Sequence, residues 1–248
     1  MISRLSVRLS NDVYRACYHH ALSTQSQEIV GLLIGQVQNE IIDIFALKIV
    51  KRLDKKQDRV EISDEQLMQS MTFTEELKTK LNKPGLNVVG WYHSHPNITV
   101  WPSHVDLKTQ FSYQRMSQDW IGLIFAVFNK EKVQKSYKYE LVAFQACHDQ
   151  LGNLSRLTLP IEIVNENDLM PEDHVLEEIT KLSDILLEET KESVYDVMEG
   201  DDYLTRLKRD LGTPIALLFF NPKIQFSLFF SNSIRTCANL GKSDHSYF

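Results

Sequence analysis

Cysteine is scarce in this chain. Its three cysteines, Cys17, Cys147 and Cys237, lie far apart without paired spacing, and no Cys-x-x-Cys motif occurs. We therefore expect a reducing compartment, the cytoplasm or nucleus, and no structural zinc site built on thiolates. No constellation around these cysteines supports a papain-like nucleophile. A secretory leader is not expected either, because no charged segment followed by an apolar run opens the sequence.

An excess of positive charge is also missing. The formal net charge is -6 over 248 residues, which argues against nucleic acid as the main ligand because a phosphate-binding surface needs concentrated Lys and Arg. One basic run, Lys51, Arg52, Lys55, Lys56 and Arg59, is local and is interpreted as a solvated loop. Long apolar runs are absent as well, so no transmembrane helix is predicted.

Two familiar zinc motifs do not occur. The chain has no His-Glu-x-x-His and no His-x-Glu followed by Pro-Cys-x-x-Cys. These absences exclude the usual zincin proteases and the nucleobase deaminases.

What the sequence does contain is a compact set of metal-ligand residues. His93 and His95 are two apart, and Asp106 follows eleven residues after His95, beyond Pro96 and Pro102. In an extended strand, side chains two apart point to the same side, so both imidazoles can face one point. Two imidazoles and a carboxylate leave one position of a tetrahedral zinc ion for water, which is typical of a catalytic site.

Purely structural interpretations of the same residues remain open at this stage. A histidine pair near a buried strand is often only hydrogen-bonded in the core or on the surface. Ser103-x-x-Asp106 also matches a helix capping box, with residues 107–118 as the helix. The capping and metal roles are compatible, because a cap holds a ligand side chain in place.

Patterns along the rest of the chain predict a mixed α/β domain ending near residue 165. A helix is expected from Ser10 or Asn11 to about residue 22, and another, with the Ser63–Gln66 capping box, to about residue 81. Glu28 precedes the first of two aliphatic strands and on general grounds would be a surface residue. Strands are predicted at residues 5–9, 29–35, 41–50, 86–92, 120–128 and 137–146, the last two as an antiparallel pair.

An acidic segment follows this domain. Residues 172–202 contain twelve Asp and Glu against two Lys. Apolar residues at helical spacing predict one long amphipathic helix within residues 166–211; they are Val175, Ile179, Leu182, Leu186, Val194 and Val197. Its apolar face must pack on its own domain or on a partner, and the partner is favoured because the first domain looks complete. Residues 212–248 form an unassigned apolar tail, with a possible hairpin around residues 221–223.

The candidate metal ligands, together with Glu28 and the residues around them, resemble the signature of the JAMM, or MPN+, family of zinc isopeptidases. The matching residues are Glu28, His93, Ser94, His95, Pro96, Ser103 and Asp106. The resemblance implies an α/β (α+β) MPN+ domain like the cytidine-deaminase architecture, with a C-terminal helical extension. It implies one catalytic Zn²⁺ held by His93, His95 and Asp106, with Glu28 as general base and Ser103 as hydrogen-bond donor to the oxyanion. Ser94, by alternation, is expected to be structural.

Flanking residues 58–67, 88–96 and 98–106 further resemble the lysine-63-specific catalytic subunits of BRISC-type complexes, a subunit type that also serves a nuclear DNA-damage-response complex. This implies a polyubiquitin substrate and a location in the cytoplasm and nucleus. It also implies a catalytically dead, pseudo-MPN partner of the Abraxas type, bound through the helical extension in a dimer of heterodimers. Direct nucleic-acid or membrane binding is not expected. An isopeptidase for another modifier or linkage, or a non-catalytic MPN scaffold, stays open as an alternative.

Overall fold

The computed structural model describes residues 5–52, 62–130, 137–165 and 173–198, the last nine by their backbone alone. The chain divides into two compact units, Met1–Ile185 and Leu186–Phe248. The possible hairpin in residues 212–248 and most of the basic run after Arg52 lie outside the described residues. Within the described ranges, no helix is both long enough and apolar enough to cross a membrane.

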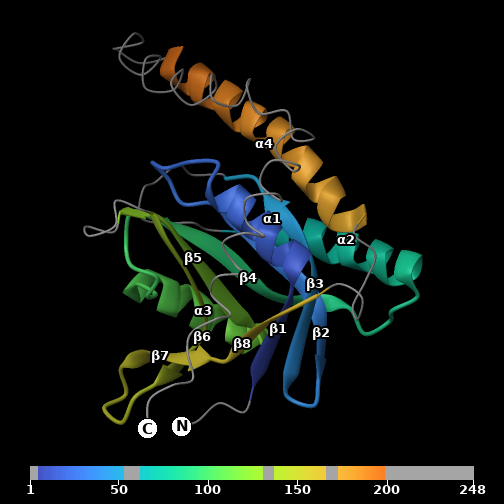
Figure 1. Ribbon diagram of the computed structural model, residues 1–248, viewed down its shortest axis with the longest axis vertical. Helices are drawn as coiled ribbons and strands as arrows, with labels where there is room; N and C mark the ends of the chain where they lie inside the picture. The colour runs from blue at the N-terminus through green and yellow to red at the C-terminus, as the bar shows by residue number, and fades with distance from the viewer. Residues whose placement is uncertain (1–4, 53–61, 131–136, 166–172, 199–248) are drawn as a thin grey trace, which may run out of the picture. The chain divides into compact units, whose positions relative to one another are not determined.

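The first unit is built on a mixed sheet of eight strands (Figure 1). Their order is β7-β6-β5-β4-β2-β3-β1-β8, and β4 lies antiparallel to β2 and parallel to β5. Aliphatic and aromatic residues fill the middle strands, which are buried on both faces. The strands are β1 (Ser6–Ser10), β2 (Val30–Gln38), β3 (Ile41–Val50), β4 (Asn87–Pro96), β5 (Ile121–Lys130), β6 (Tyr137–His148), β7 (Leu154–Leu159) and β8 (Ile161–Val164).

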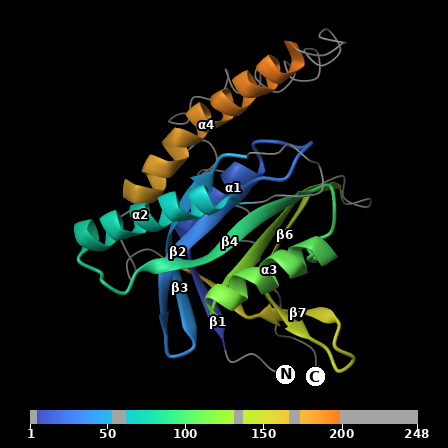
Figure 2. The same ribbon diagram turned by 180° about the vertical axis from the view of Figure 1, so that it is seen from behind.

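Helices cover both faces of this sheet. Helix α1 (Asn11–Ala21) lies on one face, and α2 (Asp64–Leu81) and α3 (His104–Met116) lie on the other (Figures 1 and 2). Leu67 of α2 and Phe111 of α3 pack against one apolar cluster that includes Trp91 of β4. On the opposite face, Tyr18 of α1 packs edge to face on Phe125 of β5, with the ring centroids 4.8 Å apart. This three-layer arrangement confirms the predicted mixed α/β class.

The predicted start and end of α2 are confirmed by its caps. Ser63 and Gln66 form a reciprocal capping box at the start of α2, and Asn82 ends that helix in the left-handed conformation with φ 50°. Strand β4 is longer than predicted and runs through Pro96, so its histidines lie within the strand and not after it. Strands β7 and β8 were not predicted, because they are short, and β8, at the sheet edge, has only intermediate or exposed residues.

Helix α4 (Asp173–Met198) forms where the amphipathic pattern predicted it. Its residues Val175, Ile179 and Leu182 are buried, and residues 173–185 belong to the first compact unit. The expectation that the apolar face covers a partner is therefore wrong for this part of the helix, which packs on its own domain. The predicted boundary near residue 165 falls just after β8, whereas the unit continues to Ile185.

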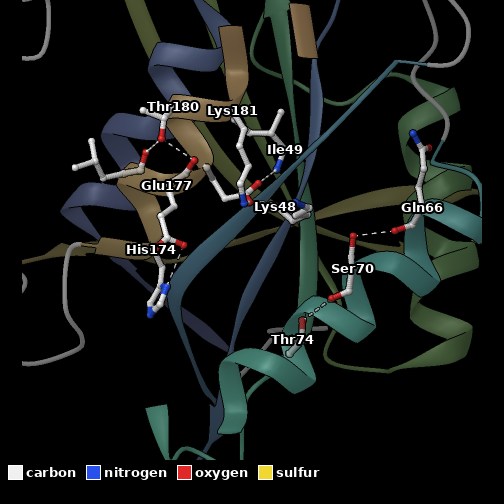
Figure 3. Close-up of polar contacts among 11 residues, drawn as sticks. Lys48, Ile49, Gln66, Ser70, Thr74, His174, Glu177, Thr180 and Lys181 are labelled. Carbon is white, nitrogen blue, oxygen red and sulfur yellow. Dashed lines mark hydrogen bonds and ion pairs between the residues drawn. The ribbon is translucent and has the colours of Figure 1, made fainter. Parts of the chain in front are cut away.

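A buried carboxylate fixes this part of α4. Glu178 is 1% exposed and accepts hydrogen bonds from Lys48 Nζ (3.0 Å), the Ile49 backbone amide (3.2 Å) and Lys181 Nζ (2.8 Å). Figure 3 shows Lys48, Ile49 and Lys181 close together, around the carboxylate that accepts their hydrogen bonds. A carboxylate is tolerated at such a site only when charge and hydrogen-bond partners replace its lost hydration. The Glu178 carboxylate therefore ties α4 to β3.

We expect Glu178→Ala to reduce the free energy of unfolding by about 3 kcal/mol, because it leaves the Ile49 amide and the Lys48 ammonium without their acceptor. Glu177→Ala is the matched control: Glu177 is 53% exposed and lies 3.7 Å from Lys80. An exposed pair of this kind contributes less than about 1 kcal/mol. Urea-induced unfolding of both variants measures the difference, and equal losses would contradict the anchoring role of Glu178.

A second buried polar contact joins α1 to β4. His20 Nδ1 lies 2.9 Å from the Tyr92 hydroxyl, and both side chains are buried. Burial, followed by the nearby charges of Arg52 and His19, lowers the pKa of His20 to about 3. Burial also raises the pKa of Tyr92. His20 is therefore neutral in the native protein, and its Nδ1 shares a hydrogen bond with the Tyr92 hydroxyl.

This contact predicts a loss of stability on acidification. Between the ordinary pKa of His20 and its lowered value, the unfolded chain binds a proton that the native chain does not. Stability is therefore full above the unfolded pKa of about 6.5 and falls by up to about 1.4 kcal/mol per pH unit below it. Because of His20 alone, we expect a loss of about 2 kcal/mol between pH 7.5 and pH 5.0.

Urea-induced unfolding at these two pH values tests the effect. His20→Gln keeps an acceptor for Tyr92 and should remove this part of the pH dependence, whereas His148→Gln, at an exposed histidine, should retain it. A His20→Gln protein that loses as much stability as the wild type would disprove the assignment.

Candidate metal centre

Strand β4 presents two imidazoles on one face of the sheet. His93 and His95 alternate with Tyr92 and Ser94, which face the other side. His93 is 0% and His95 2% exposed, and their Nε2 atoms lie 3.1 Å apart. The two nitrogens thus converge, as their spacing in the sequence predicted.

Helix α3 brings a carboxylate to the same point. Asp106 Oδ1 lies 3.5 Å from His93 Nε2, and Oδ2 lies 3.5 Å from His95 Nε2. The capping-box interpretation is also confirmed: the Ser103 amide donates to Asp106 Oδ2 (2.6 Å), and the Asp106 amide donates to Ser103 Oγ (3.2 Å). The cap therefore fixes the start of the helix and orients the carboxylate toward the histidines.

The spacing of these three groups suits a tetrahedral ion. A zinc ion bound at roughly 2.0–2.1 Å by nitrogen or oxygen ligands sets neighbouring ligand atoms about 3.3 Å apart. The two histidine nitrogens, 3.1 Å apart, are close to that separation, and each lies 3.5 Å from a different oxygen of Asp106. With one ligand atom taken from each residue, the three atoms lie within 4.8 Å of one another. Among the residues that the structure describes, this is the one group of three such side chains within reach of a common ion.

Electrostatics at the site favour bound positive charge. Burial alone would raise the pKa of the Asp106 carboxyl, but the charge and hydrogen bonds of His93, with hydrogen bonds from His95 and Ser103, hold that pKa well below its usual range. Burial likewise opposes the charged form of His95, yet hydrogen bonds with Asp106 and the Thr99 carbonyl and the charge of Glu28 raise its pKa overall. The anionic carboxylate therefore draws positive charge to the point where the ligand atoms meet.

His95 is oriented by its outer nitrogen. Nδ1 lies 2.6 Å from the Thr99 carbonyl oxygen. Because a carbonyl only accepts, Nδ1 carries a proton, so in the neutral form of His95 the lone pair of Nε2 faces the site. This is the usual arrangement of a metal-binding histidine.

Glu28 reaches the same face from the neighbouring strand. Val30 pairs with His93 across the ladder, so Glu28, two residues before Val30, projects to the side of the histidines. Its Oε1 lies 3.9 Å from His95 Nε2, and the residue is 8% exposed. The surface position considered for Glu28 is therefore wrong, because the carboxylate lies against the candidate ligands.

Ser94 holds Glu28 in place through its neighbour. The Ile29 amide donates to Ser94 Oγ (3.0 Å), and the Ser94 amide donates to the Ile29 carbonyl (3.2 Å). These two hydrogen bonds agree with the structural role expected for Ser94. They attach the residue directly after Glu28 to β4.

Ser103 and Trp101 are both exposed, just before the start of α3. Ser103 is exposed and uses its oxygen as the cap acceptor, which leaves its hydroxyl hydrogen available to another acceptor. Its role as oxyanion donor stays a prediction. Trp101 is 45% exposed, and the Arg156 guanidinium lies 3.9 Å from its ring centroid.

Sequence reasoning missed one buried residue beside the site. Gln110 is 0% exposed and follows Asp106 by one helical turn. Its amide contacts the indole of Trp91, which is two residues before His93 on the same face of β4. The only available signal was a polar residue on the buried face of α3.

This chain is similar in sequence to known proteins over most of its length. Residues 3–119 match the family described as "JAB1/Mov34/MPN/PAD-1 ubiquitin protease". A Camponotus floridanus protein named "Lys-63-specific deubiquitinase BRCC36" is 42% identical over 212 residues, covering 86% of this chain and 81% of that protein. A Xenopus tropicalis protein of the same name is 38% identical over 190 residues, covering 76% of this chain and 72% of its own length.

A solved solution structure of a Desulfitobacterium hafniense protein aligns with a TM-score of 0.43 and 17% identity, covering 65% of this chain and 96% of that one. A similarity this low supports no functional argument. The family match and the identity to the two relatives confirm the resemblance found in the sequence. This chain therefore belongs to the JAB1/Mov34/MPN/PAD-1 ubiquitin protease family.

Proposed function

We propose that this chain is a zinc-dependent deubiquitinase that hydrolyses the isopeptide bonds of lysine-63-linked polyubiquitin. The observation that carries the chemistry is the convergence of His93, His95 and Asp106, with the Glu28 carboxylate 3.9 Å from His95. The linkage rests on the names of relatives that are 38–42% identical over most of this chain.

The residues of the site have separate roles in the proposed reaction. His93, His95 and Asp106 would hold the ion, which when bound acts as a Lewis acid and lowers the pKa of a coordinated water to about 7. Glu28 Oε1 accepts a proton from the attacking water and delivers one to the departing lysine amine. The Ser103 hydroxyl donates a hydrogen bond to the oxygen that becomes negative during attack.

Exchange of Glu28 for Gln separates catalysis from metal binding. Glu28→Gln keeps the shape but cannot take the proton, so we expect kcat/KM to fall by about 10²–10⁴-fold with zinc retained. Asp106→Asn should lose both zinc and activity, because it weakens the only carboxylate among the proposed ligands. Elemental analysis and cleavage of linkage-defined diubiquitins, with the partner present, measure both properties.

Each outcome of this comparison has a distinct meaning. Wild-type cleavage by Glu28→Gln would remove Glu28 from the mechanism. Preferred cleavage of a linkage other than lysine-63 would favour the alternative isopeptidase. A wild-type protein that binds zinc and assembles with its partner but cleaves none of the substrates would favour a non-catalytic scaffold.

We also propose that full activity requires a pseudo-MPN subunit of the Abraxas type bound through α4. The support is that apolar residues continue at Val194 and Val197 in a helix that extends to Met198. These positions lie beyond the part of the helix that packs in the first compact unit. Assembly into a dimer of heterodimers and a location in the cytoplasm and nucleus stay predictions.

The partner requirement is tested at these two apolar positions. We expect Val194→Glu combined with Val197→Glu to abolish co-purification with the partner and to lower cleavage by at least about tenfold, because a charge buried in an apolar interface costs several kcal/mol. Glu192→Lys, on the opposite side of the helix, should leave both unchanged. Retained assembly in the double variant would show that the partner binds elsewhere.

A further inference from the structure

An aromatic ring lies flat against one of the two candidate histidine ligands. The indole of Trp91 stacks on the imidazole of His93 with ring centroids 4.5 Å apart and planes 12° from parallel. Both residues are almost completely buried, at 1% and 0% exposed. Residues two apart on a strand share a face, so β4 itself brings these rings together.

The two histidines are held in different ways. His95 has its outer nitrogen on the Thr99 carbonyl, whereas His93 Nδ1 finds no hydrogen-bond partner among the residues that the structure describes. A metal-binding histidine is normally fixed by a hydrogen bond from its outer nitrogen. For His93, the stacked indole is the contact that restricts rotation of the ring.

The indole is itself fixed by α3. Trp91 Nε1 donates to Gln110 Oε1 at 2.8 Å, and Gln110 Nε2 donates to the Trp120 carbonyl (2.7 Å) and to Gln114 Oε1 (3.0 Å). Because an indole only donates and a carbonyl only accepts, these contacts allow one orientation of the Gln110 amide. Every polar atom of that amide is used, so it forms a rigid link between β4 and α3.

The same helix carries the carboxylate of the site. Gln110 is four residues after Asp106, on the same side of α3. The contacts from Gln110 to Trp91 and from Trp91 to His93 therefore connect the strand ligand with the helix ligand. They reach the flat face of the His93 ring, whereas its Nε2 atom lies near His95 and Asp106.

We propose that Trp91 and Gln110 are positioning residues that set the orientation of His93 for zinc binding. The proposal rests on the proposed function, since it assumes that the site binds zinc. Neither residue is one of the three candidate metal ligands. Trp91 acts by stacking, and Gln110 acts by holding Trp91 in the plane that His93 requires.

Zinc affinity of the full-length chain, measured by competition with a chromogenic chelator, tests the proposal without an activity assay. We expect Trp91→Leu to weaken zinc binding by about 10–100-fold, as loss of a contact supporting a metal ligand does elsewhere. Trp91→Phe keeps a stacking ring and should restore most of the affinity. The visible spectrum of the cobalt-substituted protein should change in Trp91→Leu, because its bands report the geometry of the ligands.

Trp120→Leu is the matched control. Trp120 is 3% exposed, belongs to the same apolar cluster and contacts Tyr113, as Trp91 does, but it does not stack on a candidate ligand. It should lose comparable stability while keeping zinc affinity within about twofold of the wild type. Where Trp91→Leu does not fold, Gln110→Met, which removes the acceptor of the indole N–H, is compared with Gln145→Met. The Gln145 amide nitrogen donates to the Gln118 and Trp120 carbonyls and not to Trp91 Nε1, which only donates.

The results separate this proposal from the proposed function. Wild-type zinc affinity and an unchanged cobalt spectrum in Trp91→Leu, or in Gln110→Met where that variant replaces it, would overturn the positioning role. Equal weakening in the Trp91 and Trp120 variants would also overturn it, because the effect would then be general destabilisation. A wild-type chain that binds no zinc would instead refute the proposed function.

Discussion

Hydrogen bonding of β4 on both of its edges is the constraint on which the candidate site depends. Its antiparallel neighbour β2 pairs with it from Asn87 to His93, and its parallel neighbour β5 pairs with it from Gly90 to Pro96. A strand held in this way cannot slip by one residue, since a slip would turn every side chain to the other face. The pairing therefore commits His93 and His95 to the face covered by α3, and it commits Tyr92 to the face covered by α1.

The two acidic groups of the site are placed by different contacts. Ser94 binds the backbone directly after Glu28, so the register of β2 against β4 decides where the Glu28 carboxylate lies. Asp106 depends on α3, whose first turn is fixed by the reciprocal contacts with Ser103. A capping contact normally contributes about 1 kcal/mol to helix stability. Here one carboxylate serves the cap and the candidate metal site together, so folding of the helix also completes the ligand set.

Most features that could be predicted from the sequence depend on residues that are close together in the chain. The caps at Ser63 and Ser103 and the alternation through His93 and His95 involve residues within four positions of each other, and the structure contains all of them. Contacts between distant residues were harder to foresee. Burial of Glu28 depends on pairing with a strand 65 positions away, as between Ile29 and Ser94, and burial of the first half of α4 depends on Glu178 meeting Lys48. Gln110 has no motif of its own, because its role arises only when α3 is laid over Trp91.

Charge balance explains why so many polar groups can be buried together at the site. Two imidazoles and the carboxylates of Glu28 and Asp106 occupy a region where each is at most 8% exposed. Burial of such groups is unfavourable unless opposite charge compensates them. The lowered pKa of Asp106 and the raised pKa of His95 both show that this region stabilises positive charge. A bound divalent cation would be the largest local charge and would satisfy both nitrogens and the carboxylate at once. Burial of these groups therefore lowers the stability of the fold, and the buried apolar strands around the candidate site compensate for that loss.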